Sequence, residues 1–215
     1  MDRSEIERIF TSRGWLAHQP KSLQEIVFRQ ATVVTFATRD YVYHSGDDAG
    51  GIYGIIDGGF GFYLAGREAR EALGHVLRAG HWFGYTSVAG RRRITTFRAL
   101  EPSQALFLPL TSLNEIALRS VEYMRAFAAL PAFGAEMAAS AGADLLIRRN
   151  DQRIAATLLR VTAAEDGVQS SHPDGFHLTQ SELAEMANVS RDVMNRTLAR
   201  FKSLGWIATN YNRVR

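Results

Sequence analysis

Cysteine is absent from the 215 residues of this chain. Without a thiol the protein has no disulfide, no thiolate nucleophile and no cysteine-ligated iron–sulfur cluster, so any sensing depends on other chemistry. Long apolar runs are also missing, because none approaches the roughly 18 residues that span a bilayer. The N-terminal stretch MDRSEIERIF alternates charges where a signal peptide has a basic head and an apolar core. These absences predict a cytoplasmic protein with no membrane partner.

A strong overall charge is missing too, since the formal net charge is only +3. Its distribution is uneven. Residues 1–147 hold 15 Lys plus Arg and 15 Asp plus Glu, whereas residues 148–215 hold 10 and 7. The whole basic excess therefore lies in the last third, which is typical of a polyanion-binding module joined to a neutral domain.

The hydrophobic period changes twice along the chain. The first thirty residues have helical spacing on both sides of Pro20, with Ile6, Phe10, Leu23 and Val27 as core candidates. From Ala31 to about Leu110, short β-rich runs such as ATVVTF, GIYGII and EALGHVL alternate with turn signals such as SGDDAGG. Their spacing of roughly eight to twelve residues predicts an antiparallel sandwich or jelly roll.

After Pro109 the helical period returns. One stripe of LTSLNEIALRSVEYMRAF is expected to carry Leu113, Ile116, Ala117 and Val121, and Pro131 is expected to kink or restart the helix. The stretch 132–149 is rich in alanine, which allows close helix approach. Its residues Phe133, Met137, Ala141 and Leu145 recur four apart. We expect a connecting helix that packs on its symmetry mate, and a purely intramolecular role remains open.

The most specific local pattern is LTQSELAEMANVSRDVMNRTLARFKSLGWI, residues 178–207. Thr179 and Glu182 have capping-box spacing, so a helix is expected to begin at Gln180. Asn188 stands where a tight turn needs positive φ, Ser190 is placed to cap a second helix, and Gly205 is placed to end it. Two capped helices joined by so short a turn predict a helix-turn-helix.

The second helix has two chemically different sides. At about 3.6 residues per turn, its apolar side carries Val193, Met194, Thr197, Leu198, Phe201 and Leu204, and its polar side carries Asp192, Asn195, Arg196, Ala199 and Ser203. This arrangement suits the major groove, where Arg reads guanine, Asn reads adenine and Asp accepts from cytosine. Thr179, Gln180, Ser190 and Arg191 complete the predicted contact set with double-stranded DNA. The alternative is an ordinary amphipathic hairpin with a solvated face.

Taken together, these motifs resemble the Crp–Fnr superfamily of bacterial transcription regulators. The resemblance rests on HSGDDAGGIYGIIDGG, GHWFGY, TFRAL, RIAATLLRV and the helix-turn-helix pattern, in that order from about Val33 onward. It implies an α+β protein: an antiparallel β-roll sensor of the jelly-roll, cyclic-nucleotide-binding type, a long dimerisation helix and a winged helix-turn-helix. The expected divisions are 1–125, 126–149 and 150–215.

The resemblance also implies function. It implies a homodimer that recruits or obstructs RNA polymerase, with Arg191, Asp192 and Arg196 on the family's base- and phosphate-contacting positions and Asn195 on a specificity position. The family usually follows GWI with a β-hairpin wing, whereas ATNYNRVR has room for what looks like one strand. We therefore expect either a minimal wing or a chain that is short of its native C-terminus.

The family's nucleotide clamp is only half present. Its arginine, which pairs with the cyclic phosphate, aligns with Arg93, while Tyr85, after Gly84, stands where the family has a ribose-binding glutamate. Ile94 and Thr95 follow the arginine, and Ile94 removes a hydroxyl donor. An incomplete polar set predicts that cyclic AMP is not the effector. A different anion bound by Arg93, with Arg92 beside it, and the absence of any effector both stay open.

The sequence leaves two other functions open. A cupin-like metal enzyme with an appended helix-turn-helix needs clustered ligands, but His75 and His81 lie six residues apart without a paired carboxylate, and we expect no metal site and no catalytic residues. No histidine is singled out as a haem ligand by its spacing. A constitutive DNA-binding dimer would use the β-roll only as a scaffold.

Overall fold

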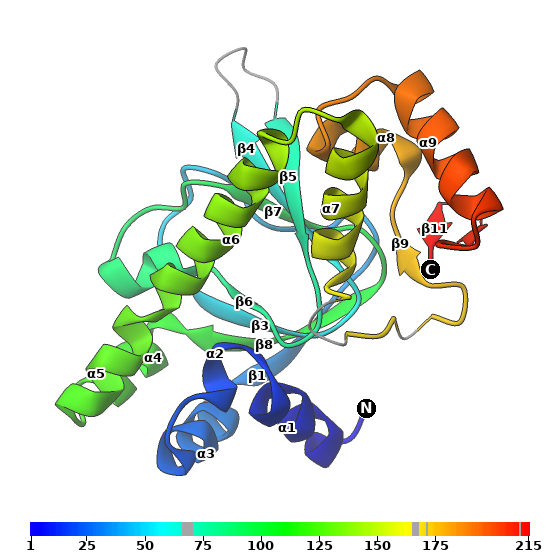
Figure 1. Ribbon diagram of the computed structural model, residues 1–215. Helices are drawn as coiled ribbons and strands as arrows, with labels where there is room; N and C mark the ends of the chain where they lie inside the picture. The colour runs from blue at the N-terminus through cyan, green and yellow to red at the C-terminus, as the bar shows by residue number, and fades with distance from the viewer. Residues whose placement is uncertain (66–70, 165–167, 171, 211) are drawn as a thin grey trace.

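The computed structural model describes the chain except residues 66–70, 165–167, 171 and 211. Three helices come first: α1 (Arg3–Ser12), α2 (Gly14–Ala17) and α3 (Lys21–Gln30). The side chains that gave the helical period, among them Phe10, Leu23 and Val27, are fully buried. The predicted N-terminal helices are confirmed, and they pack at one end of the β-structure (Figure 1).

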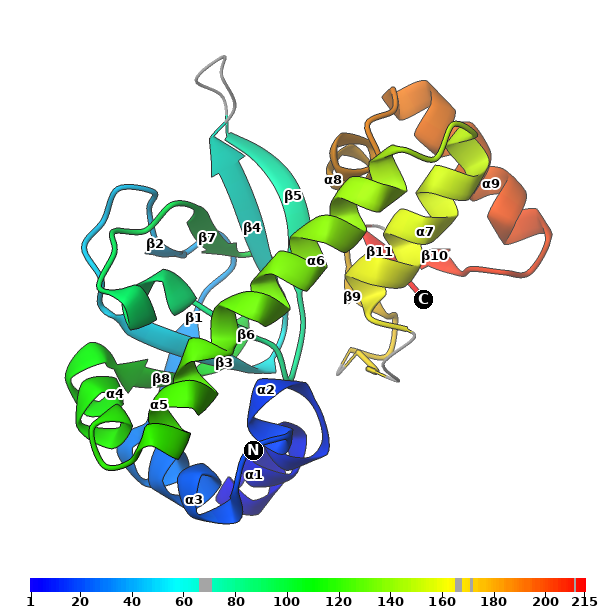
Figure 2. The same cartoon turned by 60° about the vertical axis from the view of Figure 1, so that its left-hand side comes forward.

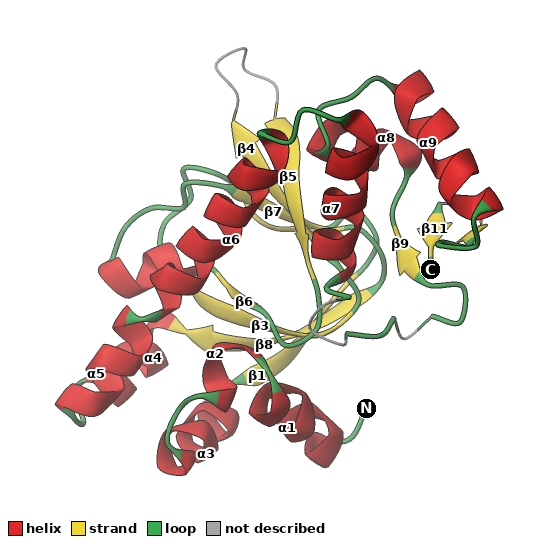
Figure 3. Ribbon diagram, in the orientation of Figure 1, coloured by secondary structure: helices red, strands yellow, loops and turns green. Residues whose placement is uncertain are grey.

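The β-roll consists of two four-stranded antiparallel sheets (Figure 3). One sheet has the order β1-β8-β3-β6 and the other β2-β7-β4-β5. The strands are β1 (Thr32–Phe36), β2 (Tyr41–Tyr43), β3 (Gly51–Asp57), β4 (Phe60–Ala65), β5 (Glu71–Leu77), β6 (Trp82–Phe83), β7 (Thr96–Ala99) and β8 (Ser103–Pro109). The predicted jelly-roll class is confirmed: the two sheets pack against each other, and the outer face of the β1-β8-β3-β6 sheet packs against the N-terminal helices.

Aromatic rings fill the space between the two sheets. Tyr43, Phe60, Phe83 and Phe97 form one buried cluster with Ile55, Leu77, Ala99 and Ala105. The rings of Phe83 and Phe97 stack with centroids 4.3 Å apart. Each such ring buries a large apolar surface, so this cluster is a main source of the stability of the β-roll.

The helical region after β8 differs from the prediction. One continuous stripe was expected, but the chain forms α4 (Leu110–Ala117) and α5 (Val121–Ala128), separated by a turn in which Ser120 caps the second helix. Leu113 and Ile116 are buried as expected, whereas Val121 is 63% exposed. The placement of Val121 on the buried stripe is wrong, because the turn resets the helical phase between the two segments.

The connecting helix is α6 (Leu130–Leu145), and Pro131 lies in its first turn, where its missing N–H is tolerated. The expected restart at Pro131 is therefore confirmed. Of the residues 126–149 that were expected to form the connecting helix, 126–128 belong to α5 and 146–149 form the link to the next helix. Figure 2 shows α6 crossing beside the β-roll and leading into the C-terminal part of the chain.

The C-terminal part contains α7 (Asn150–Thr162), β9 (Phe176–His177), α8 (Gln180–Met186), α9 (Arg191–Ser203), β10 (Thr209–Asn210) and β11 (Arg213–Val214). The last two strands pair with each other, and β11 also pairs with β9. The expectation of a single strand after GWI is wrong. Asn212, at φ 55, supplies the left-handed residue of a tight hairpin between β10 and β11. The sequence pattern did not reveal this hairpin because each of its strands has only two residues.

The two ends of the molecule share a core. Leu73, Val76 and Leu100 of the β-roll pack with Leu183, Met186 and other residues of the C-terminal part in one buried cluster. A buried ion pair between Arg78 and Glu101 lies at the same junction, with a nitrogen–oxygen distance of 2.8 Å. Apolar packing holds the helix-turn-helix against the sensor, and polar contacts cross the junction from Arg78 to the Val161 and His177 carbonyls and from Arg213 to Glu101.

Candidate nucleic-acid interface and sensor interior

Local hydrogen bonds define the start of α8. The Glu182 backbone N–H donates to the Thr179 hydroxyl at 3.1 Å, and the Thr179 N–H donates to the Glu182 carboxylate at 2.8 Å. This reciprocal pair is the predicted capping box, and α8 begins at Gln180 as expected. Leu178 and Leu183, the expected hydrophobic staple, are both buried in one cluster.

The turn between α8 and α9 has the conformation that the sequence predicts. Asn188 has φ 48, and the Val193 N–H donates to the Ser190 hydroxyl at 3.3 Å at the start of α9. Gly205, at φ 72, follows the last turn of that helix. These bonds fix the direction in which α9 leaves the turn, and with it the face that α9 presents.

The two sides of α9 are separated as predicted, with one exception. Met194, Leu198 and Phe201 are at most 4% exposed and anchor the helix to the shared core. The polar side is exposed, and it comprises Asp192, Asn195, Arg196, Ala199 and Ser203. Leu204 was placed on the apolar side, but it is 48% exposed, because the helix ends there and the chain turns away.

The cationic groups at the start of α9 are not neutralised. Arg191 and Arg196 are exposed, and neither forms an ion pair with a carboxylate of the described residues. Arg200, one turn further on, lies 3.7 Å from Asp151. The free guanidinium groups are therefore concentrated where the polar face begins, which is the arrangement that an anion or a base edge needs.

A surface groove of about 510 Å³ connects three of the predicted contact residues. It is lined by Thr179, Gln180 and Arg191 and by the hairpin residues Thr209, Asn210, Asn212 and Arg213. Sequence reasoning missed these hairpin residues. The signal available was the asparagine pair around Tyr211, since asparagine tolerates positive φ.

Arg93 lies inside the β-roll and is only 3% exposed. Its Nη1 donates to the Gly84 carbonyl at 2.7 Å and its Nη2 to the Gly51 carbonyl at 2.9 Å. The guanidinium carbon lies 4.1 Å from the centre of the Tyr43 ring. The Arg93 guanidinium thus links the segments that contain Tyr43, Gly51 and Gly84. Of its nitrogens, only Nε lacks a partner among the described residues.

The neighbours of Arg93 divide into two groups. Thr95 is 8% exposed, but β7 begins only at Thr96, which is fully buried as well. The expected strand parity therefore does not extend back to Arg93. Ile94 is 67% exposed. Arg92 is also exposed, and its Nε lies 3.2 Å from Asp48. Arg92 and Ile94 therefore lie outside the sensor interior, in the irregular segment before β7.

Tyr85 follows Gly84, whose φ of 86 starts a short 3₁₀ helix (η1, Tyr85–Ala89). The Tyr85 hydroxyl lies against Gly134 of α6, where any Cβ atom would clash with it. Burial raises the pKa of this phenol above its ordinary value, so it stays neutral. The Arg93 guanidinium contacts Gly84, whereas the Tyr85 hydroxyl, which replaces the family's carboxylate, is directed at α6.

His75 is a buried histidine that is strongly perturbed by its surroundings. It is 5% exposed, and its Nδ1 lies 2.7 Å from Arg160 Nη1, while Arg160 also pairs with Asp144 at 2.6 Å. Burial, and then the nearby arginine charge, lower the pKa of His75 well below its usual value. His75 therefore accepts from Arg160 as a neutral ring. Within the described residues, no group of three or more His, Asp or Glu could hold a metal.

Family models match two parts of the chain. A cyclic nucleotide-binding domain matches residues 33–120, and a Crp-like helix-turn-helix domain matches residues 152–215. A comparison with curated proteins finds no match. In the described part of the chain, no helix is long and apolar enough to cross a bilayer.

Solved structures of similar fold include FixK2 of Bradyrhizobium japonicum, at 17% identity and a TM-score of 0.72, with 86% of this chain and 90% of that chain covered. The c-di-GMP responsive global regulator CLP of Xanthomonas campestris has 19% identity and a TM-score of 0.66, with 91% and 98% covered. A CRP-family transcriptional regulator of Thermus thermophilus has 21% identity and a TM-score of 0.66, with 84% and 90% covered.

The fold and the two matched domains define a transcriptional regulator in which a cyclic-nucleotide-binding fold carries a helix-turn-helix. This is the architecture of the Crp–Fnr superfamily, and the chain belongs to it. Its members are regulators rather than enzymes, so the cupin-like enzyme is set aside.

Proposed function

We propose that the protein acts in the cytoplasm as a homodimer that binds an inverted-repeat operator, with one α9 in the major groove of each half-site. The observation that carries this proposal is the exposed polar face of α9. Arg191 at the start of the helix and Arg196 on this face form no ion pair with a described carboxylate. Major-groove helices need both a polar outer face and an apolar anchor, and α9 has both.

The contact residues take different roles in this proposal. Arg196 gives a bidentate contact to guanine, Asn195 pairs with adenine and Asp192 accepts from cytosine, while Ala199 lets the backbone approach the bases. Thr179, Gln180, Ser190 and Arg191 contact phosphates and set the register. The groove that joins Arg191 to the hairpin supports a phosphate path that continues over Asn212. By analogy with the family, the bound dimer recruits or obstructs RNA polymerase.

The exposed face of α6 supports a dimer. The residues Ala132, Ala135, Ala139 and Gly142 recur at intervals of three and four, and all are exposed. Such a heptad row of small residues lets two helices approach closely. It differs from the row of Phe133 and Met137 read from the sequence, because Met137 packs against the β-roll core.

The experiment is selection of operator from random duplexes, followed by binding to the selected DNA. We expect an inverted repeat with half-site centres about 34 Å apart. Ala139→Glu places a charge in the α6 row, so it is expected to give monomers and to lose the preference for two half-sites. Ala138→Glu is the matched control, because position 138 flanks the row and tolerates charge. Selection of a single asymmetric half-site, or a dimeric Ala139→Glu variant, would contradict the proposal.

We further propose that cyclic AMP is not the effector. Arg93 already donates to two backbone carbonyls and rests on Tyr43, and the surrounding roll is filled with aromatic rings. A cyclic phosphate would have to displace these contacts without the carboxylate that recognises ribose. The solved relative CLP is described as c-di-GMP responsive, which supports effectors other than cyclic AMP on this fold.

Cyclic AMP is accordingly expected to leave both the thermal unfolding midpoint and the operator affinity unchanged. Arg93→Met is expected to lower the free energy of unfolding by about 1–3 kcal/mol, because the Gly84 and Gly51 carbonyls each lose a charged donor and keep the bond from Ser87. Differential scanning fluorimetry and denaturant unfolding measure these effects. A saturable rise in the midpoint with cyclic AMP, abolished by Arg93→Met, would overturn the proposal.

A further inference from the structure

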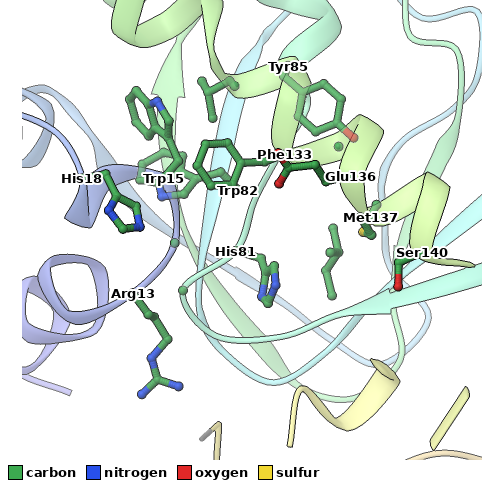
Figure 4. Close-up of a pocket in the computed structure, with 15 residues that line it drawn as sticks. Arg13, Trp15, His18, His81, Trp82, Tyr85, Phe133, Glu136, Met137 and Ser140 are labelled. Carbon is green, nitrogen blue, oxygen red and sulfur yellow. The ribbon is translucent and has the colours of Figure 1, made fainter. Parts of the chain in front are cut away.

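A cavity lies outside the sensor interior, between the N-terminal helices and α6. It has a volume of about 590 Å³ and is bordered by α2, the β5–β6 turn, Tyr85 and α6. Figure 4 shows the labelled side chains around a common space, with Arg13 and His18 on one side and Met137 and Ser140 on the other. A volume of this size is typical of small-molecule sites.

Much of the wall is apolar and aromatic. Trp15 and Trp82 are 1% and 6% exposed, and their rings meet edge to face with centroids 5.4 Å apart. Phe133 of α6 adds a ring that is 40% exposed. The Trp82 Nε1–H has no acceptor among the described residues. The wall therefore offers rings for a hydrocarbon and contains one donor that nothing in the described chain satisfies.

Close backbone contact keeps one rim of the cavity in place. Gly14 and Gly80 both have positive φ, and a Cβ atom on Gly14 would collide with the Gly80 carbonyl oxygen. A Cβ atom on Gly80 would in turn meet the aliphatic part of Arg13. Only glycine fits at both positions, so the packing of α2 against the β5–β6 turn is specified by the sequence and holds the Arg13 side chain at the rim.

The polar groups around the cavity include one arginine, two histidines and one carboxylate. Arg13 is partly exposed and forms no ion pair with any carboxylate in the described parts of the chain. His18 and His81 also line the cavity, and Glu136 is the only carboxylate among the lining residues. A permanent guanidinium beside an aromatic wall favours a ligand with one anionic end and one apolar end.

We propose that this cavity binds a small apolar carboxylate, with its hydrocarbon against Trp15, Trp82 and Phe133 and its carboxylate at Arg13. The occupied site would contact α6 through Phe133, Met137 and Ser140, the helix that we propose forms the dimer. Binding itself requires neither the dimer nor DNA. A binding measurement on the protein alone therefore fails or succeeds independently of the proposed regulator function.

The test is a fluorescence titration of the full chain carrying Trp206→Phe with sodium octanoate. Trp206 is 66% exposed and lies in the C-terminal part, with its ring tilted against Phe201, so its removal leaves the two cavity tryptophans as reporters. Octanoate is expected to change their emission saturably. Octanol, which has no charge, is expected to bind about tenfold more weakly, and octylamine is expected not to bind.

Two substitutions connect the signal to the cavity. Ser140→Phe fills the space from α6 and is expected to abolish octanoate binding. Arg13→Gln is expected to weaken it about tenfold, whereas Arg119→Gln, an exposed arginine at the α4–α5 turn, is expected to leave it unchanged. The proposal is overturned if octanoate gives no saturable change, if octylamine binds equally well, or if Arg13→Gln binds like the parent. Circular dichroism establishes that each variant is folded.

Discussion

Replacing Arg78 by methionine is expected to lower the free energy of unfolding by about 3–5 kcal/mol, because it removes one partner of a buried ion pair at the junction of the sensor and the C-terminal part. Arg78 is 1% exposed, and its Nη1 lies 2.8 Å from Glu101 Oε1. Burial lowers the pKa of Arg78 to about 10, so the group remains charged at neutral pH.

The other contacts of Arg78 all reach the C-terminal part. Its Nε donates to the Val161 carbonyl at 3.3 Å, its Nη2 donates to the His177 carbonyl at 3.2 Å, and the guanidinium lies 4.7 Å from the centre of the Phe176 ring. Arg213 adds a second cation, 3.2 Å from Glu101. The substitution therefore leaves two carbonyls without donors and the Glu101 carboxylate with one partner.

Urea unfolding of the full chain measures this effect, and Arg92→Met is the matched control. Arg92 also pairs with an aspartate, but its side chain is 74% exposed and that of Asp48 is 86% exposed. Exposed pairs contribute about 0–1 kcal/mol, so the control is expected to unfold nearly like the parent. If Arg78→Met and Arg92→Met cost the same, the buried contacts of Arg78 do not stabilise this junction.

Replacing Arg196 by alanine is expected to weaken binding to the selected operator by about 1–3 kcal/mol and to relax discrimination at one base pair of each half-site. Arg196 is exposed on the polar side of α9, and it lies beside Asn195. A bidentate arginine–guanine contact is specific for that base pair, so its loss should be small on duplexes in which the guanine is already replaced.

The measurement is competition binding at fixed salt against a panel of single-base operator variants, because phosphate contacts make affinity salt-dependent. Arg119→Ala is the control, since that exposed arginine lies at the α4–α5 turn, far along the chain from α9. An equal loss of affinity on every duplex would assign Arg196 to phosphate contact and would remove it from base reading.

Local rules were enough to predict the helix-turn-helix. The capping box, the positive φ of Asn188 and the Ser190 cap are each decided by residues within a few positions of one another. The β-roll was equally accessible, because period-2 alternation and turn residues are local signals. The prediction that failed was the helical phase after α4. A three-residue turn after Ala117 separates α4 from α5, and it leaves Val121 exposed.

Long-range features could not be obtained from spacing. Arg78 contacts Val161 and His177, which are 83 and 99 residues away in sequence. The side of α6 that faces the roll depends on Tyr85 packing against Gly134, and neither residue type predicts that contact. The pairing of β10 with β11 is also supported by β9, which lies far earlier in the chain. Tertiary packing decides each of these features.

The central claim is that α9 reads bases from the major groove, and methylation interference at guanine N7 tests it most directly, since N7 lies in that groove. With the selected operator, we expect N7 methylation of guanines in both half-sites to block binding, and we expect Arg196→Ala to become insensitive at one guanine per half-site. Undiminished binding to N7-methylated operator, together with inhibition by minor-groove methylation of adenine N3, would contradict the account.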